Sequence, residues 1–294
     1  MRTQFVQTVE SLLGVDSRLV LLLGDIGVYG FRKAFASFPD RVYNIGILEQ
    51  ATVSLASGLA STGLIPVFHT IAPFIVERCL EQLKVDFCYQ RIGGNFVSVG
   101  ASYDYAALGC THHCPSDIGI LQNLPGMEIV VPGTAGEFDR LFRQAYADGH
   151  PTYFRLSERE NPVDRSVIFG KADVIRSGKR ATVVAVGTAL GPVLEATGDM
   201  DVSVLYYTTV APFDADNLME HCFTPKILLV EPYYSGGLAG EICAAFCARP
   251  IALDCIGVPR RFLTDYGITE EHDEVIGFTA GMIQSRLEKL INES

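Results

Sequence analysis

Residues 109–114 of the chain, with the sequence GCTHHC, combine two thiols with two imidazoles. Such side chains serve two chemistries: zinc binding, and proton transfer by a histidine whose pKa lies near neutrality. A structural zinc site takes four converging ligands, mostly as two pairs separated by a longer loop. One short stretch cannot surround an ion tetrahedrally without backbone strain, and the sequence offers no second pair at a suitable spacing. We therefore expect no metal site here, which leaves a histidine with a chemical role or a buried turn.

A second candidate is Glu49, the acid in the stretch RVYNIGILEQATVSLASG. The apolar residues before it predict a strand, and the small residues after it predict a helix over about 49–62 that another backbone can approach closely. A carboxylate in the first turn of a helix is favoured by the helix dipole. Spacing alone therefore leaves two interpretations open for Glu49, a helix-start carboxylate or a functional acid.

The composition limits the classes of protein to which the chain can belong. Its 294 residues are 48% hydrophobic, and this length predicts two domains that each have a core of their own. A net charge of −11 argues against a nucleic-acid partner, because phosphate binding needs a basic face. We expect a soluble protein whose partners are not nucleic acids.

The N-terminal stretch MRTQFVQTVESLL is polar and acidic where a signal peptide needs an apolar segment. The apolar run at residues 19–23 is too short to span a bilayer. The eight cysteines are scattered in apolar surroundings, as at Cys79, Cys88, Cys243 and Cys247, which is typical of reduced, structural thiols. The expectation is a cytoplasmic enzyme that does not bind membranes.

Apolar strands alternate with helical patterns along the whole chain. Strand-like stretches are RLVLLLG, RVYNIGI, IPVFHT, NFVSVGA, EIVVPG and PTYFRL, and later ATVVAVGTA, DVSVLYYTTV, KILLVEP and IALDCIGVP. Helices are expected between them, including one over 74–89 and one over 279–294. This alternation predicts two three-layer α/β domains, 1–165 and 166–294, each with a largely parallel sheet covered on both faces. The aperiodic stretch 158–172, which carries mixed charge, is predicted to be a linker.

Ligands of open α/β sheets bind beyond the carboxyl ends of the strands. The loops expected at that edge are GDIGVYG, which contains Asp25, the junction before Glu49, FHTIAPF, which contains His69, and ASYDYAALGCTHHC. The functional site is therefore expected in the first domain, with GCTHHC as part of it.

The stretch FPDRVYNIGILEQATVSLASGLASTGLIPVFHT resembles the pyrimidine-binding domain of transketolase and of deoxyxylulose-phosphate synthase. The resemblance continues through APFIVERCLEQ, GCTHHCPSDIGILQNLPGMEIVVPG and PTYFRLSEREN. In the second half, VAVGTA, LLVEPYYSGGLAGEI, VPRRF and YGITEE are similar to the C-terminal domain of transketolase. Essentially the whole chain is covered, with the motifs in the order of the family.

The resemblance implies an enzyme that uses thiamine diphosphate. In that family a glutamate hydrogen-bonds the N1′ nitrogen of the aminopyrimidine ring and so promotes loss of a proton from the thiazolium C2. Glu49 matches that glutamate, and the role requires a dry site in which the acid can share its proton. Phe74 matches the region whose aromatic side chains stack on the pyrimidine, with a plain core phenylalanine as the alternative. Arg78 and Ile47, from the same two stretches, are the further cofactor-binding residues.

The resemblance also implies the substrate contacts. Family members carry Gly-x-Thr-His where this chain has GCTHHC, and their histidine reaches the hydroxyls of the donor sugar and helps proton transfer. His112 takes that catalytic and substrate-binding role, with His113 beside it. The other expected substrate-binding residues are Asp25, His69 and Arg159. A guanidinium suits the oxygens of a phosphate, and a salt bridge in the linker is the alternative for Arg159.

Two motifs depart from the family pattern. Leu108 and Gly109 stand where relatives often have Asp-Gly, whose aspartate meets a donor hydroxyl. The phosphate clamp Ser-Arg-Gln-Asn is altered to SEREN at residues 157–161, so that glutamates flank Arg159. The donor and the acceptor are therefore left open, as sugars or as sugar phosphates.

The chain lacks the Gly-Asp-Gly stretch and following asparagine with which the family binds the diphosphate through Mg²⁺. LGDIG at residues 23–27 lies in the pyrimidine-type domain and lacks the second half of that motif. The resemblance therefore implies the C-terminal subunit of a split transketolase, active only with an N-terminal subunit that supplies Gly-Asp-Gly and the Mg²⁺ ligands. Because pyrimidine-type domains also pair around a two-fold axis, we expect an α₂β₂ assembly.

Three alternatives stay open. The β subunit of a 2-oxoacid dehydrogenase or decarboxylase shares this order of domains, although Thr111 and His112 favour transketolase. A non-catalytic regulatory subunit would have no need for a desolvated acid at Glu49. A homodimer that works without a partner conflicts with the missing Mg²⁺ motif.

Overall fold

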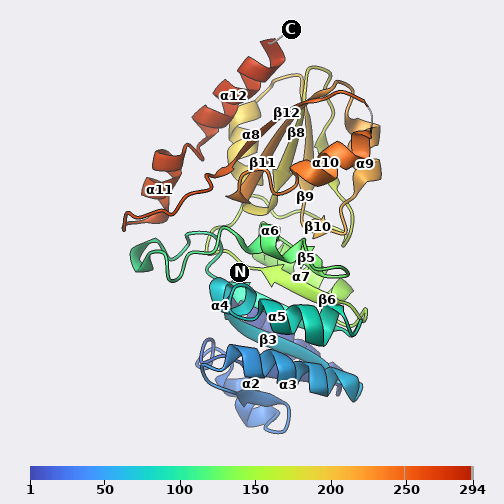
Figure 1. Ribbon diagram of the computed structural model, residues 1–294, viewed down its shortest axis with the longest axis vertical. Coiled ribbons are helices and arrows are strands. Elements are labelled where there is room, and N and C mark those ends of the chain that lie inside the picture. The colour runs from blue at the N-terminus through green and yellow to red at the C-terminus, as the bar shows by residue number, and fades with distance from the viewer. Residues whose placement is uncertain (248, 293–294) are drawn as a thin grey trace.

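A seven-stranded sheet forms the lower half of the molecule, in the order β10-β5-β6-β4-β3-β1-β2 (Figure 1). The computed structural model describes residues 1–247 and 249–292. The strands of this half are β1 (Leu19–Leu23), β2 (Val42–Asn44), β3 (Ile65–Ile71), β4 (Gly94–Val99), β5 (Glu128–Val130) and β6 (Pro151–Arg155). The longer helices between them are α1 (Arg2–Val15), α2 (Arg32–Ser37), α3 (Glu49–Ser61), α6 (Asp117–Leu121) and α7 (Ala135–Ala145).

A five-stranded sheet forms the upper half, in the order β12-β11-β8-β9-β7 (Figure 1). Its strands are β7 (Asp173–Arg176), β8 (Thr182–Val186), β9 (Ser203–Tyr207), β11 (Lys226–Tyr234) and β12 (Ala252–Val258). The helices are α8 (Leu190–Thr197), α9 (Ala215–His221), α10 (Ala239–Phe246), α11 (Thr269–Ile276) and α12 (Ala280–Asn292), with the short 3₁₀ turn η3 (Gly187–Ala189) before α8. Helices cover both faces of the sheet.

The predicted fold class is confirmed, because both sheets are mostly parallel and helices pack on their faces. Each sheet has one antiparallel edge pair, β10 (Thr209–Ala211) with β5 and β7 with β9. The predicted linker over 158–172 contains neither helix nor strand. Strand β10 comes from the second half of the chain but pairs with β5 in the first sheet, so the two halves of the chain share that sheet. A division into domains 1–165 and 166–294 stays a proposal.

The prediction of one continuous helix over 74–89 is wrong. The segment is divided into α4 (Ala72–Val76), α5 (Leu80–Gln82) and the π-helix η1 (Leu83–Cys88). The Arg78 N–H already bonds to the Pro73 carbonyl with the wider spacing of a π turn, which ends the regular α-helical ladder. The helix is therefore broken at the residues next to Arg78.

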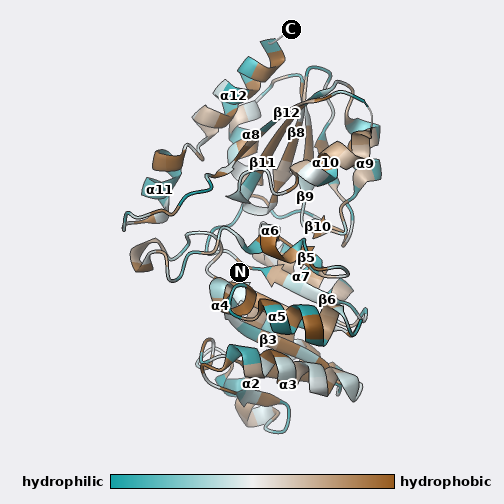
Figure 2. Ribbon diagram, viewed as in Figure 1, coloured by the Kyte–Doolittle hydropathy of each residue, from teal (hydrophilic) through white to brown (hydrophobic). Residues whose placement is uncertain are grey.

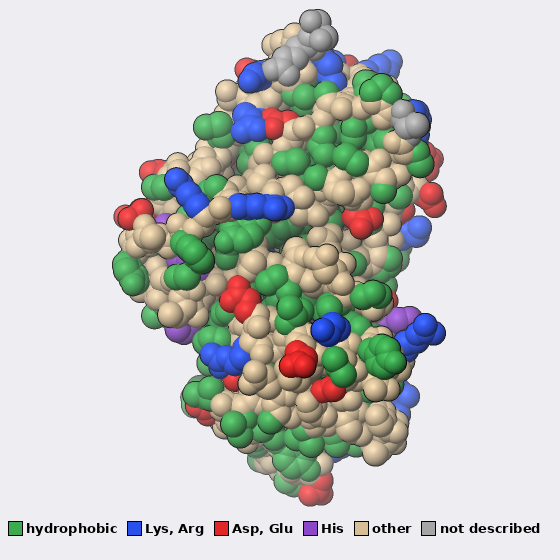
Figure 3. All heavy atoms as spheres, viewed as in Figure 1, with side chains coloured by type: hydrophobic (Ala, Val, Ile, Leu, Met, Phe, Trp, Pro, Cys, Tyr) green, Lys and Arg blue, Asp and Glu red, His purple; other side chains and the backbone are tan. Residues whose placement is uncertain are grey.

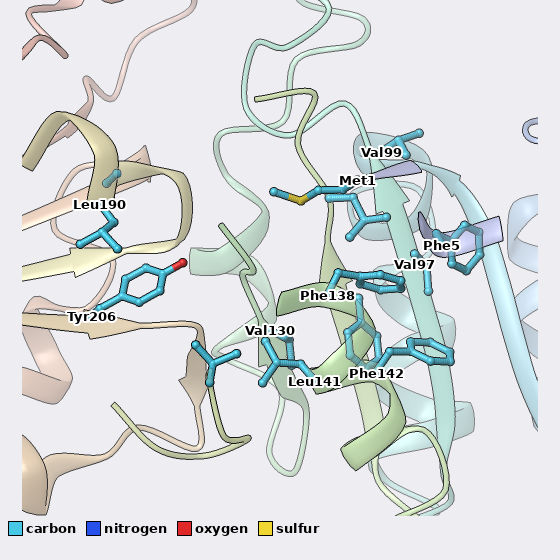
Figure 4. Packing of buried hydrophobic residues seen from close by; sticks show 14 of the residues in the cluster. Met1, Phe5, Val97, Val99, Val130, Phe138, Leu141, Phe142, Leu190 and Tyr206 are labelled. Carbon is cyan, nitrogen blue, oxygen red and sulfur yellow. The ribbon is translucent and has the colours of Figure 1, made fainter. Parts of the chain in front are cut away.

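The core runs through both halves of the molecule. The strands of both sheets are mostly hydrophobic, whereas α12 alternates hydrophobic and hydrophilic residues as a surface helix does (Figure 2). One cluster of buried side chains includes Val130 and Phe138 of the first half together with Leu190 and Tyr206 of the second (Figure 4). The Tyr206 hydroxyl donates to Glu137 Oε2 at 2.7 Å across this boundary. A shared core therefore fixes how the two halves are placed.

The cysteines only partly follow the expectation. Cys79 and Cys88 are buried, as predicted, but Cys243 on α10 and Cys247 just after that helix are exposed. In the described part of the chain all cysteines are free thiols. None of the helices formed by residues 1–247 and 249–292 is long and apolar enough to cross a membrane.

Candidate active site

The candidate site lies at the carboxyl edge of the first sheet. Strands β1, β2, β3 and β4 pair in parallel, so the segments that follow them emerge at one edge. Asp25 follows β1, Glu49 follows β2, His69 lies near the end of β3, and His112 lies in the loop after β4. The topology therefore gathers four of the predicted residues at one end of the sheet.

Glu49 is the first residue of α3, and its side chain is only 2% exposed. Arg78 Nη1 lies 2.7 Å from Glu49 Oε1 in an ion pair, yet this buried oxygen has no aligned hydrogen-bond donor. The Arg78 guanidinium also lies over the ring of Phe74, 4.1 Å from its centroid. The structure thus brings together three of the predicted cofactor-binding residues around a buried carboxylate.

Local backbone features hold Phe74 and Arg78 in place. Pro73 lies in the first turn of α4, where its missing N–H costs no hydrogen bond. The Cys79 thiol donates to the Phe74 carbonyl at 3.2 Å. Ile47, the fourth predicted cofactor-binding residue, is 67% exposed and lies on the segment that leads into α3. Its contact with a cofactor stays a prediction.

His112 joins this group from the loop after β4. Its ring packs edge-on against Phe74 at 5.6 Å between centroids, and against Tyr105 at 6.3 Å. The Thr111 hydroxyl lies 2.9 Å from His112 Nδ1, which leaves Nε2 as the other ring nitrogen that can contact a ligand. A partly exposed imidazole that packs on the same phenylalanine as Arg78 suits proton transfer to or from a bound substrate.

Tyr105 is a residue that the sequence analysis missed. Burial raises the pKa of its hydroxyl, and the nearby charge of Arg2 opposes that rise. Tyr105 also contacts His112, so the histidine packs between two aromatic rings, those of Phe74 and Tyr105. No local pattern marks this tyrosine, although its position four residues before the Gly-x-Thr-His motif could have drawn attention to it.

His113 does not lie with His112 against Phe74. Its ring is buried and packs edge-on against His272 of α11, 5.8 Å away. Burial lowers the pKa of His113, and the neighbouring His272 lowers it further. Its predicted role in substrate binding stays a prediction, and its ring contact joins the lower half of the molecule to α11.

Asp25 and His69 border a separate hollow of about 440 Å³ between β1, β3 and α1. Asp25 has a left-handed backbone with φ 62° and is exposed, and its carboxylate accepts from Asn44 Nδ2 at 3.1 Å. His69 is fully buried, with its Nδ1 2.8 Å from the Val97 carbonyl. The hollow also contains Arg2, so charges of both signs surround it.

Because His69 is buried, we expect the free energy of unfolding to depend on pH. Burial lowers its pKa from 6.5 to about 4, so the folded chain keeps it neutral while the unfolded chain binds a proton between those values. Its contribution to stability is complete above pH 6.5 and is lost as the pH falls toward 4. Relative to a His69→Gln variant, the wild type should lose about 3 kcal/mol of unfolding free energy over this window. Urea denaturation at a series of pH values measures it, and parallel curves for the two proteins would contradict it.

Arg159 lies between the two halves of the molecule. Its Nη1 donates to Asp273 Oδ2 at 2.6 Å, and its guanidinium lies 5.3 Å from the ring of Tyr103. The ion pair is the alternative that the sequence left open, formed with α11 rather than within the linker. A role for Arg159 in binding a substrate phosphate stays a prediction.

The altered clamp SEREN is held on Asp104 at its first two residues, while the side chains of Glu158 and Glu160 are exposed. Ser157 Oγ and the Glu158 N–H donate to the two oxygens of Asp104, at 3.1 and 3.0 Å. Burial raises the pKa of Asp104 to about 6, against the effect of these hydrogen bonds. No local pattern indicates Asp104, because its partners lie more than fifty positions away along the chain.

Potential metal ligands converge at one place among residues 1–247 and 249–292. Side-chain atoms of Glu128, Asp148 and His150 lie within 4.8 Å of one another, at the amino ends of β5 and β6 and so opposite the candidate site. GCTHHC forms no such cluster: Cys110 is exposed, whereas Cys114 is buried in the core. The stretch is a loop in which His112 packs against Phe74 and His113 packs against His272.

Comparisons with known proteins find relatives for nearly the whole chain. Residues 1–165 match the family model of the transketolase pyrimidine-binding domain. The chain is 37% identical, over 99% of its length and 95% of the relative, to an uncharacterized 33.6 kDa protein in the fasciation locus of Rhodococcoides fascians. It is 30% identical to an apulose-4-phosphate transketolase subunit of Actinobacillus succinogenes, with 75% of each chain covered.

Solved structures give the same result for the fold. A split-gene transketolase, described as an inactive β4 tetramer, superimposes with a TM-score of 0.86 at 25% identity, covering 99% of this chain and 97% of that one. The transketolase of Campylobacter jejuni gives a TM-score of 0.82 at 18% identity, and the chain spans 46% of its length. The buried Glu49, the matched domain and these relatives together lead to one conclusion: the chain belongs to the transketolase family.

Proposed function

We propose that the chain is the C-terminal subunit of a split, thiamine-diphosphate-dependent transketolase. The reaction would transfer a two-carbon ketol unit from a ketose donor to an aldose acceptor. The observation that carries the proposal is Glu49, a buried carboxylate whose Oε1 has no aligned hydrogen-bond donor. Its ion-pair partner Arg78 lies over Phe74, the ring against which His112 packs. A buried carboxylate oxygen whose only charged neighbour is not aligned as a donor needs an explanation, and a ligand that donates to it supplies one.

The residues around Glu49 fit an aminopyrimidine ring. Its carboxylate can accept a hydrogen bond from a protonated ring nitrogen, and burial strengthens that bond. Phe74 offers an aromatic face to a flat ring, and Arg78 balances the charge of the acid at 2.7 Å. When bound, the cofactor supplies the electron sink for cleaving a carbon–carbon bond beside a carbonyl.

His112 is the side chain that we assign to the substrate. Its ring is half-exposed at the mouth of this group, where a hydroxyl of the sugar can approach Nε2. Asp25 and His69 border the neighbouring hollow and are proposed to contact the rest of the sugar. The ion pair of Arg159 with Asp273 is one reason to leave open whether the substrate is phosphorylated.

A partner subunit is proposed to supply the Gly-Asp-Gly motif and the Mg²⁺ ligands. Two considerations support it: several relatives are named as subunits of a transketolase, and the similar split-gene structure is described as an inactive β4 tetramer. Exposed apolar side chains lie around the start of α3, namely Ile47 (67%) and Leu48 (58%), with Leu55 further along the helix. On the face seen in Figure 3, hydrophobic side chains gather at the end of the molecule that carries α2 and α3. Such a surface suits coverage by another subunit, and an α₂β₂ assembly in the cytoplasm is the proposed form.

The test is a calorimetric titration of thiamine diphosphate with Mg²⁺, first into this chain alone and then into its mixture with the candidate partner. Tight binding by the mixture alone, lost when the partner's Gly-Asp-Gly is mutated, supports a shared site. Tight binding by the isolated chain contradicts the need for a partner. Absence of binding in both samples contradicts the proposed function and favours a regulatory subunit.

A further inference from the structure

The backbone hydrogen bonds within the loop that carries His112 close local turns, with a single bridge between its two ends. The loop comprises residues 100–116, between β4 and α6, and we call it the β4–α6 loop. Its regular structure consists of the 3₁₀ turn η2 (Ala106–Leu108) and one bridge, in which the Cys114 N–H donates to the Ser102 carbonyl at 2.7 Å. Contacts from other parts of the molecule must therefore fix the position of the loop.

Strand β11 of the upper sheet holds both ends of the β4–α6 loop. Ser102 Oγ donates to the Pro232 carbonyl, and the Tyr234 N–H donates to the Pro115 carbonyl at 2.9 Å. Ser102 and Pro115 are both buried, so water does not compete for these bonds. The two ends of the loop are thus anchored on the opposite domain.

Helix α11 holds the middle of the loop, and Figure 1 shows the loop reaching out beneath it. The Tyr103 hydroxyl donates to Asp273 Oδ1 at 2.5 Å, while Asp273 Oδ2 accepts from Arg159 at 2.6 Å. The buried ring of His272 packs edge-on against Tyr103 at 5.6 Å and against His113 at 5.8 Å. Two residues of the loop, Tyr103 and His113, are therefore packed against α11, at His272 and, for Tyr103, also at Asp273.

Gly109 brings the same two elements into close contact. A Cβ atom at this glycine would lie 2.8 Å from the ring of Tyr266, which belongs to the segment leading into α11. Its φ of 71° is also in the left-handed region that favours glycine. The turn just before Thr111 and His112 is shaped by this approach of the C-terminal domain.

We propose that Asp273 is a positioning residue, which acts through Tyr103 and the β4–α6 loop to hold His112 against Phe74. The inference rests on the proposed function for the role of His112, and it gives the C-terminal domain a part in the geometry of a site that lies on the other domain. Asp273 accepts from the loop with one oxygen and is fixed by Arg159 with the other, so that the acceptor cannot rotate away. Tyr103, only 1% exposed, transmits this constraint to the backbone of the loop.

The first experiment measures turnover of the chain with its partner subunit and a ketose donor. Asp273→Asn and Tyr103→Phe are expected to lower kcat by about 10- to 100-fold, because small displacements of a reacting group are costly. The dissociation constant of thiamine diphosphate should stay within about two-fold, since Glu49 and Phe74 are not displaced. The matched control is Asp254→Asn, which breaks the pair of Asp254 with Arg286 between β12 and α12 and should retain wild-type kcat.

A double-mutant cycle separates positioning from general destabilisation. In a His112→Ala background, Asp273→Asn should cost little further activity, because the side chain that it positions is absent. Equal losses in both backgrounds, or equal losses for Asp254→Asn and Asp273→Asn, would overturn the inference. Tyr103→Phe removes a single hydroxyl and gives the same comparison if Asp273→Asn folds poorly.

Hydrogen–deuterium exchange tests the same contact without any turnover. Amides of residues 103–114 should exchange several-fold faster in the Asp273→Asn and Tyr103→Phe variants than in the wild type or Asp254→Asn. Unchanged exchange in this segment would contradict the inference even if the enzyme is active. Faster exchange in a chain that shows no transketolase activity with its partner would instead leave the contact established and the proposed function wrong.

Discussion

Replacing Glu49 by glutamine is expected to lower transketolase turnover by about 10²–10⁴-fold, the range typical of a lost acid–base group. The amide keeps the size of the side chain but cannot share a proton with a ring nitrogen in the way that a carboxylate can. Because Glu49 opens α3 and is 2% exposed, a glutamine of nearly equal volume should leave the helix in place. Initial rates with the partner subunit, together with far-ultraviolet circular dichroism, measure both effects.

The control for this change is Glu195→Gln on α8, an exposed glutamate of the upper half of the molecule. It loses the same charge and should retain the activity of the wild type. Cofactor titration adds a second readout, since Glu49→Gln should also weaken thiamine diphosphate binding by the assembled enzyme. Retention of wild-type turnover in Glu49→Gln would remove the basis of the proposed function.

The second large effect is expected for the buried ion pair of Arg155 and Asp117. Arg155 is 2% exposed and donates through Nε to Asp117 Oδ2 at 2.7 Å, and Asp117 is fully buried. The same guanidinium donates to Ser102 Oγ at 2.6 Å and to the Pro232 carbonyl at 3.2 Å. It therefore links the first sheet, the β4–α6 loop and β11.

An Arg155→Met variant should lose about 3–5 kcal/mol of unfolding free energy, because it leaves the Asp117 carboxylate buried without its counter-charge. The midpoint of urea denaturation measures the loss. Arg18→Met is the matched control: Arg18 is 56% exposed in its pair with Asp16, so its removal should cost far less than removal of Arg155. Similar losses in the two variants would show that burial of the Arg155 pair does not govern its contribution.

These two predictions differ in what the sequence alone could support. Glu49 was identifiable from the apolar strand before it and the small-residue helix after it, together with the resemblance of that stretch to a known family. Arg155 is the penultimate residue of the predicted strand PTYFRL, and nothing in its neighbourhood indicates that Asp117, 38 positions earlier, pairs with it inside the core. The first depends on local sequence, whereas the second depends on how β6 and α6 pack.

The sequence by itself determined the alternation of strands and helices, the fold class and the edge of the sheet at which the site is expected. These properties follow from hydrophobic periodicity and from the parallel connection of successive strands, which are local or nearly local features. The resemblance to a known family added that Glu49, Phe74 and Arg78 belong to two segments that meet there. The predicted helix over 74–89 failed because a wider π turn at residue 78 is set by packing rather than by periodicity.

Only the tertiary structure decided which neighbours the remaining residues have. His113 faces His272 instead of joining His112 at Phe74, and Arg159 pairs with Asp273, 114 positions away. Strand β10 crosses from the second half of the chain into the first sheet. The physical reason is common to all three: the energy of a contact depends on burial and on partners brought together by the shared core, and neither quantity is encoded in the spacing of residues along the chain.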